Sequence, residues 1–145
     1  MNHAHRVLII DPFDEAEMYA IALRRLQVSV QIASSGRDGL AAFENHRPDT
    51  VVIALHLQGS VDVVRSLKRQ RPAPLVVVLS AHLYEPVLSP MIDAGCDAIQ
   101  MTPCLPYSLI GRLQDLSARR STASEDRMTV TERETTRRAR SNQSR

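Results

Sequence analysis

Residues 6–16 read RVLIIDPFDEA, an apolar run that ends at an aspartate and leads into an acidic segment. Two later stretches, PDTVVIALHLQGS at 48–60 and PLVVVLSAH at 74–82, repeat this order of a β-branched run followed by a polar loop. Short continuous apolar runs of this kind are typical of strands buried on both faces of a parallel sheet. None approaches the roughly 18 residues that a membrane-spanning helix requires. The pattern therefore predicts buried strands and no membrane span.

Between these runs lie longer amphipathic stretches, so the chain divides into five units of a strand followed by a helix. The predicted strands are Arg6–Ile10, Ser29–Ala33, a strand that begins near Thr50, Leu75–Leu79 and Ala98–Met101. The sequence thus predicts an α/β domain of the doubly wound class, with a five-stranded parallel sheet covered by helices on both faces.

Two of the predicted helices have unusual sequences. In the first, a capping-type start at 14–17 precedes apolar residues that share one helical face, namely Met18, Ile21, Ala22 and Leu26. In the fourth, Pro86 and Pro90 both fall within 84–94. Because an interior proline removes a hydrogen bond and clashes with the preceding turn, we expect this helix to be shortened, kinked or displaced.

The charge is distributed unevenly along the 145 residues, whose formal net charge is +2. The predicted domain, 1–117, is mildly acidic, whereas 118–145 is rich in arginine, serine and threonine and has almost no large apolar side chains. Burial in that segment could not offset the entropy lost on ordering, so we predict a disordered basic tail. Nucleic-acid binding through the tail is an alternative, but acidic residues are interspersed and no aromatic residue is available for stacking on bases.

The two cysteines, Cys96 and Cys104, are expected to remain thiols in a reducing compartment. Met1 is followed almost at once by the first apolar run, which leaves little room for a secretory leader. We therefore expect a cytoplasmic protein.

The stretches 6–16, 48–60 and 74–82, together with AGCDAIQMTPC at 94–104, resemble the receiver domain of two-component response regulators. The resemblance covers about residues 6–116 and implies the CheY-like, flavodoxin-like fold with strand order 2-1-3-4-5. In such a sheet, ligands bind at the carboxyl ends of the strands, so the residues that follow each strand decide the function.

At those strand ends the sequence departs from the family's pattern. The resemblance implies an acidic pair after the first strand, an aspartate that accepts the phosphoryl group at the end of the third, a Ser or Thr after the fourth and a Lys-Pro pair after the fifth. The matching residues are Asp11, Ser80 and Pro103; the differing ones are Pro12, Ala54 and Thr102. Ile99 occupies the position where the family usually has a switching aromatic residue, and His56 lies in the same degenerate pocket.

These substitutions predict a domain that no longer accepts a phosphoryl group. Ala54 has no lone pair with which to attack phosphorus, and Asp11 alone is a poor site for Mg²⁺, which prefers several oxygen ligands. We expect no cofactor, weak or absent magnesium binding, no other metal site and no catalytic residue. By resemblance, the Thr102–Pro103 peptide bond is expected to be cis.

The leading hypothesis is therefore a pseudo-receiver, a non-enzymatic signalling domain that binds a protein partner independently of phosphorylation. Its partner would be a histidine kinase, another response regulator, an output protein or a second copy of the chain. The predicted partner face combines the fourth helix, fifth strand and last helix, and its markers are Tyr84, Pro86, Pro90, Ile99 and Tyr107. The alternative is a sensor that binds a small molecule in the remodelled pocket beside Asp11, Ser80 and Thr102.

Overall fold

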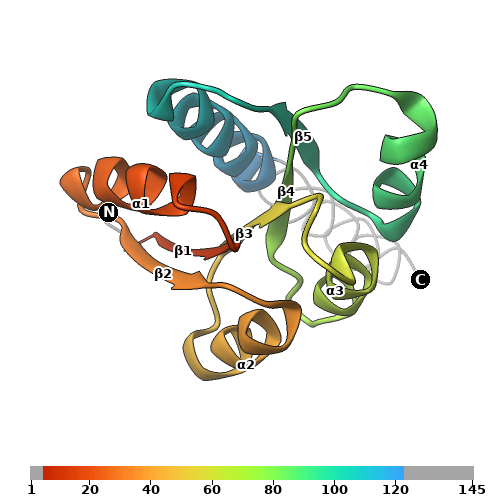
Figure 1. The fold of residues 1–145 in the computed structure, drawn as a ribbon. Helices are drawn as coiled ribbons and strands as arrows, with labels where there is room; N and C mark the ends of the chain where they lie inside the picture. The colour runs from red at the N-terminus through yellow and green to blue at the C-terminus, as the bar shows by residue number, and fades with distance from the viewer. Residues whose placement is uncertain (1–4, 123–145) are drawn as a thin grey trace, which may run out of the picture. The chain divides into compact units, whose positions relative to one another are not determined.

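The computed structural model describes residues 5–122 of the chain, which form alternating strands and helices (Figure 1). In chain order these are β1 (Arg6–Ile10), α1 (Glu15–Arg25), β2 (Ser29–Ala33), α2 (Gly36–His46), β3 (Thr50–Ala54), α3 (Ser60–Lys68), β4 (Leu75–Ser80), α4 (Glu85–Ala94) and β5 (Ala98–Met101), followed by a last helix over 106–122. The five strands lie where the apolar runs predict them.

The strands form one parallel sheet in the order β2-β1-β3-β4-β5. This confirms the predicted fold class and the strand order that the resemblance implies. The strand order reverses between β1 and β3. The chain passes from β1 to β2 on one side, whereas from β3 it passes to β4 on the other side. In open parallel sheets this switch point is where ligands bind, at the carboxyl edge.

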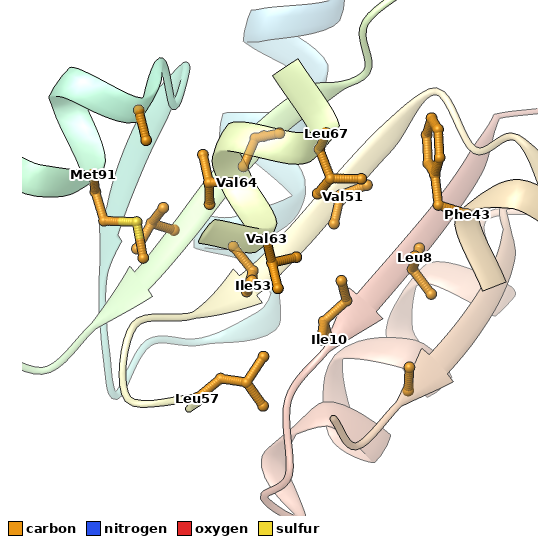
Figure 2. Packing of buried hydrophobic residues seen from close by; sticks show 14 residues of the cluster. Leu8, Ile10, Phe43, Val51, Ile53, Leu57, Val63, Val64, Leu67 and Met91 are labelled. Carbon is orange, nitrogen blue, oxygen red and sulfur yellow. The ribbon is translucent and has the colours of Figure 1, made fainter. Parts of the chain in front are cut away.

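One face of the sheet packs against α2, α3 and α4 (Figure 2). Leu8, Ile10, Val51 and Ile53 point from β1 and β3 into a cluster that includes side chains of all three helices. Alternate residues such as Ile9 point to the opposite face, which is covered by α1 and the first part of the last helix (Figure 1). Burial on both faces explains why these strands are continuously apolar.

The buried face of α1 differs from the prediction. Its buried residues are Ala16, Tyr19, Ala20 and Leu23, which recur at helical spacing, while Met18, Ile21 and Leu26 are exposed. The small side chains of the two alanines allow α1 to approach the sheet closely, and Tyr19 fills the adjoining space. The predicted apolar face is therefore wrong, and it forms an exposed apolar surface on α1 instead.

Helix α4 is longer than the prolines suggest. It runs without interruption from Glu85 to Ala94 and ends at Gly95, whose φ of 98° is readily adopted by glycine. Pro86 lies in the first turn, where a backbone N–H would have no helical acceptor, so only Pro90 occupies an interior position. Of the expected shortening, kink or displacement, shortening is therefore wrong, and a kink or displacement at Pro90 stays a prediction.

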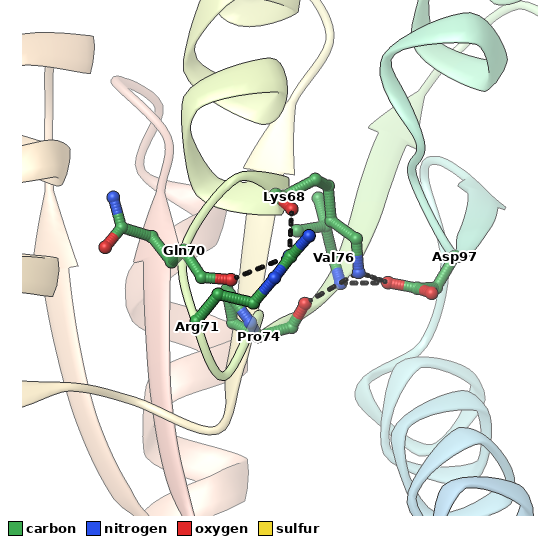
Figure 3. A network of polar contacts seen from close by, with 6 residues as sticks. All are labelled: Lys68, Gln70, Arg71, Pro74, Val76 and Asp97. Carbon is green, nitrogen blue, oxygen red and sulfur yellow. Dashed lines mark hydrogen bonds and ion pairs between the residues drawn. The ribbon is translucent and has the colours of Figure 1, made fainter.

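At the amino edge of the sheet, a polar network joins α3 to the start of β4 and β5 (Figure 3). The Lys68 ammonium donates to the Asp97 carboxylate and to the Pro74 carbonyl, both at 2.9 Å. The same Asp97 oxygen accepts the Val76 N–H at 2.8 Å. One carboxylate thereby fixes two strands and a helix at the end of the sheet opposite the expected site.

The compact unit that contains the sheet ends at Leu113, and a second unit begins at Gln114. The last helix continues through 122, whereas the sequence predicts disorder from 118 onward. Within this continuation, Arg119 lies 3.1 Å from Asp115 one turn earlier, an exposed ion pair that adds a small stabilisation to the helix. The remainder of the predicted tail, 123–145, lies outside the described residues. Within residues 5–122, no helix combines the length and apolar composition that crossing a membrane would need.

Candidate functional site

The predicted strand-end residues lie along one edge of the sheet. Asp11 directly follows β1, Ala54 ends β3, Ser80 ends β4 and Thr102 follows β5. The pairing of neighbouring strands places these four strand ends side by side, because Ile10 pairs with Ile53, Ala54 with Leu79 and Ser80 with Met101. The fold therefore gathers at one edge the residues that the resemblance assigns to the phosphoacceptor pocket.

Asp11 is almost fully buried, with 2% of its surface exposed. Its backbone N–H donates to the Ala33 carbonyl at 2.9 Å, and its Oδ1 accepts the Phe13 N–H at 2.8 Å. Its Oδ2 has no hydrogen-bond partner among the described residues. Burial raises the pKa of this carboxyl, and the Phe13 hydrogen bond opposes the rise only in part. Asp11 is the one acid present of the acidic pair that the resemblance implies, and its ionised form is thus poorly stabilised.

A second carboxyl, Glu15 at the start of α1, lies close enough to Asp11 to interact with it electrostatically. Burial raises the pKa of Glu15, and the charge of Asp11 raises it further. Along α1, the buried Tyr19 hydroxyl lies 3.5 Å from the Cys104 sulfur in the loop after β5. Burial and this contact raise the pKa of Tyr19. Sequence reasoning missed Glu15 and Tyr19 because only the packing of α1 brings them toward the strand-end loops, where Cys104 lies.

Ala54 places a methyl group at the end of β3, where the family pattern has an aspartate. It is 5% exposed, and its carbonyl accepts the Leu57 N–H at 3.1 Å, which closes the loop before α3. Pro12, beside Asp11, is exposed and contributes no charge. Neither position offers an oxygen nucleophile.

The Ser80 hydroxyl is engaged in a local turn. It donates to the His82 carbonyl at 2.7 Å and accepts the His82 N–H at 3.1 Å. Across the edge, the Thr102 N–H donates to the Ser80 carbonyl at 2.9 Å, and the Thr102–Pro103 peptide bond is cis, as the resemblance implies. These contacts give Ser80 a structural task, which is to shape the loop after β4.

His56 is not isolated in its loop. Its ring meets that of His82 edge to face, with centroids 5.9 Å apart and planes at 83°. His82 follows β4 by two residues, as His56 follows β3 by two, and both are exposed. Each histidine lies two residues after the end of its strand, and this equal spacing is the sequence signal that could have identified the pair.

A cavity of about 540 Å³ opens beside Pro12 and His56. Its other lining residues come from the loop before α2, from α2 itself, from the loop before α3 and from α3, and they include Ser34, Ser35, Arg37 and Leu40. Asp11, Ser80 and Thr102, the residues predicted to bind a small molecule, do not line this cavity.

The residues of the predicted partner face have different surroundings. Tyr84 and Tyr107 are 64% and 83% exposed, and Pro86 and Pro90, which belong to α4, are exposed as well. Ile99, at the expected switch position, is partly buried and packs against the main core cluster. Other exposed apolar residues close to them in the sequence are Leu83 and Val87 beside Tyr84, and Met101 and Leu105 before Tyr107.

No cluster of three or more histidine, cysteine or acidic side chains among residues 5–122 could hold a metal ion. Cys96 and Cys104 are both free thiols, and burial raises the pKa of Cys96.

Comparison with known proteins gives both sequence and structural relatives. The chain is 30% identical over 113 residues to the DNA-binding response regulator MtrA of Mycolicibacterium smegmatis, which covers 75% of this chain and 49% of that protein. It is 32% identical over 129 residues to the transcriptional regulatory protein KdpE of Mycobacterium tuberculosis, covering 83% of this chain and 54% of the relative. The chain thus spans about half the length of these curated relatives. No protein-family model matches it.

Solved structures with the same fold include a response-regulator receiver domain protein (CheY-like) from Methanospirillum hungatei, with a TM-score of 0.74 and 21% identity over 81% of this chain and 97% of the other. A response regulator signal receiver domain from Bermanella marisrubri has a TM-score of 0.69 and 26% identity over 77% of this chain and 97% of the other. Together, the homologues and the structural neighbours support the assignment of this chain as a response-regulator receiver domain of the CheY-like fold.

Proposed function

We propose that this chain is a pseudo-receiver, a non-enzymatic signalling domain that binds a protein partner without first accepting a phosphoryl group. The observation that carries the proposal is Ala54, whose methyl group occupies the buried carboxyl end of β3 between the strands that lead to Asp11 and Ser80. An aspartyl phosphate forms when a carboxylate oxygen attacks phosphorus, and a methyl group has no electron pair to donate.

The surroundings of Ala54 support the same conclusion. Mg²⁺ binds through oxygen ligands in octahedral geometry, and a phosphoryl group needs nearby cations to neutralise its charge. At this edge Asp11 is a buried carboxyl with a raised pKa, Pro12 has no carboxylate and Thr102 has no positive charge. The site therefore favours weak or absent magnesium binding. A domain that accepts no phosphoryl group lacks the modification that would favour one conformation over another, so we expect a single resting conformation.

The proposed contact surface is the face of α4, β5 and the start of the last helix, where Tyr84, Leu105 and Tyr107 expose large apolar areas. Aromatic side chains with exposed rings are enriched in protein interfaces. A histidine kinase, another response regulator, an output protein or a second copy of this chain are the candidate partners. One relative is named a DNA-binding response regulator, and this chain covers about half of that protein, so DNA binding is not part of the proposal.

A second candidate, small-molecule binding, is favoured by the cavity beside Pro12 and His56. Its size falls in the range of ligand pockets, and apolar walls with a few polar groups are usual in such sites. This location replaces the one expected from the sequence, because Asp11, Ser80 and Thr102 are not among its lining residues.

The proposal is tested by titrating the isotope-labelled full chain with Mg²⁺ and beryllofluoride, an analogue that coordinates an acceptor carboxylate in place of a phosphoryl group. We expect the backbone amide NMR resonances of the wild type to remain unchanged. The matched control is the variant Pro12→Asp/Ala54→Asp/Thr102→Lys, which restores the family's residues and should show shifts at the strand ends. Saturable shifts in the wild type that centre on β3 would overturn the proposal.

A further inference from the structure

Two histidines stand together at the carboxyl edge of the sheet without a role in the proposed function. His56 lies in the loop between β3 and α3, and His82 lies in the loop between β4 and α4. Their rings are exposed and in edge-to-face contact, with centroids 5.9 Å apart. The strands that precede them are hydrogen-bonded neighbours, so the sheet itself sets their spacing.

The backbone is held on both sides of His56. Before it, the Leu55 N–H donates to the Leu79 carbonyl at 2.9 Å, and the Leu55 carbonyl accepts the hydroxyl of the buried Ser60 at 2.7 Å. After it, Leu57 is buried in the core cluster. His56 therefore projects outward from a loop whose neighbouring residues cannot move freely.

The backbone of His82 is held by a single hydroxyl. Ser80 accepts its N–H and donates to its carbonyl, so both polar groups of the His82 backbone are fixed by one buried side chain. A pair of ligands whose backbones are fixed in advance loses little entropy when it binds an ion.

We propose that His56 and His82 form a two-imidazole binding site for a borderline divalent transition-metal ion such as Zn²⁺. Imidazole nitrogen is a preferred ligand of zinc, copper and nickel, whereas Mg²⁺ prefers oxygen. Two imidazoles that bind one tetrahedral ion with metal–nitrogen bonds of about 2.0 Å have ring centres roughly 5 to 6 Å apart. The observed separation of 5.9 Å fits this range, and binding requires each ring to turn out of edge-to-face contact so that one of its nitrogens points at the ion. Water occupies the remaining positions, since residues 5–122 contain no cluster of three such ligands.

This site goes beyond the proposed function and does not depend on it. It uses neither the buried Asp11 carboxyl nor the position of the missing aspartate. His56 also lines the cavity beside Pro12, so an ion held by the pair lies next to a space that is open to solutes.

The test measures Zn²⁺ binding by calorimetry on the full chain carrying His3→Ala and His5→Ala, which removes chelation by the N-terminal histidines. We expect saturable binding that weakens by roughly tenfold or more in His56→Gln and in His82→Gln, because each change turns a chelate into a single ligand. The matched control is His46→Gln at the end of α2, an exposed histidine outside the pair, which should leave the affinity unchanged.

A second readout identifies the ligands directly. Zinc should shift the ring C–H NMR resonances of His56 and His82 and leave those of His46 in place, and circular dichroism should show that all variants are folded. The proposal is overturned by the absence of saturable zinc binding, by an affinity that survives both glutamine variants, as it would with thiol ligands, or by ring shifts confined to other histidines.

Discussion

Asp11 shows how one residue can keep the family's position while its environment changes. With Pro12 and Ala54 beside it, the carboxyl retains one hydrogen bond from the Phe13 N–H and leaves Oδ2 without a partner among the described residues. A buried carboxylate with half of its acceptors satisfied is poorly compensated for the loss of water. Its main contribution is to the shape of the loop before α1.

The pH dependence of stability tests this interpretation of Asp11. Because burial raises the folded-state pKa above the unfolded value, ionised Asp11 destabilises the fold, and that destabilisation disappears as the pH falls through the folded pKa. Asp11→Asn should therefore unfold at higher urea concentration than the wild type at pH 7.5, with a difference that shrinks toward about pH 4. The exposed Asp14→Asn is the control, and an Asp11→Asn variant less stable at pH 7.5 would contradict the account.

Ser80 gives a second prediction at this scale. Removing its hydroxyl in Ser80→Ala leaves the His82 N–H without its acceptor and should lower the free energy of unfolding by about 1 to 2 kcal/mol. Ser80→Thr keeps the hydroxyl and should be close to the wild type in urea denaturation. Equal losses in both variants would mean that the hydroxyl does not hold this loop.

At the scale of elements, Lys68 and Asp97 connect α3 with β4 and β5 (Figure 3). Asp97→Ala removes the acceptor of the Val76 N–H and the partner of a half-buried ammonium, so stability should fall by about 1 to 3 kcal/mol. The matched control is Asp62→Ala, which breaks the exposed ion pair with Arg65 and should cost less than about 1 kcal/mol. Equal losses of stability in Asp97→Ala and Asp62→Ala, measured by thermal and urea unfolding, would contradict this role of Asp97.

Gly39 sets how closely α2 approaches the sheet. A Cβ at this position would lie 2.5 Å from Cδ1 and 2.9 Å from Cγ1 of Ile10, a fully buried residue of β1. Gly39→Ala should therefore destabilise the domain by about 1 to 3 kcal/mol through overpacking. Gly111→Ala, in open space on the last helix, should be neutral or stabilising by up to about 1 kcal/mol. A denaturation midpoint that is lower for Gly111→Ala than for Gly39→Ala would contradict the close packing of α2 against Ile10.

The elements also show which features could be predicted from the sequence. Continuous runs of apolar, mostly β-branched residues identify β1, β3 and β4, because strands buried on both faces have few polar positions. The face of α1 could not be chosen from spacing alone, since Ala16, Tyr19 and Leu23 recur as regularly as Met18 and Ile21, and only packing selects between them. At the site, strand ends were predictable, but the contact between Tyr19 and Cys104 joins residues far apart in the chain.

At the scale of the whole molecule, the fold and its relatives support a receiver domain, and the residues at the strand ends are the basis of our proposal that the domain accepts no phosphoryl group. The scaffold places the ends of β1, β3, β4 and β5 together, yet a methyl group, a proline and a threonine stand where the resemblance implies two acids and a lysine. Because one architecture can carry many functions, the function of this domain must be argued from the site.

The most direct measurement is the intact mass of the full chain after incubation with acetyl phosphate and Mg²⁺. The account predicts no phosphoryl adduct on the wild type and an adduct on Pro12→Asp/Ala54→Asp/Thr102→Lys, with circular dichroism showing that the variant is folded. A stable adduct on the wild type, mapped to any residue at the carboxyl edge of the sheet, would contradict the central claim that this domain signals without accepting a phosphoryl group.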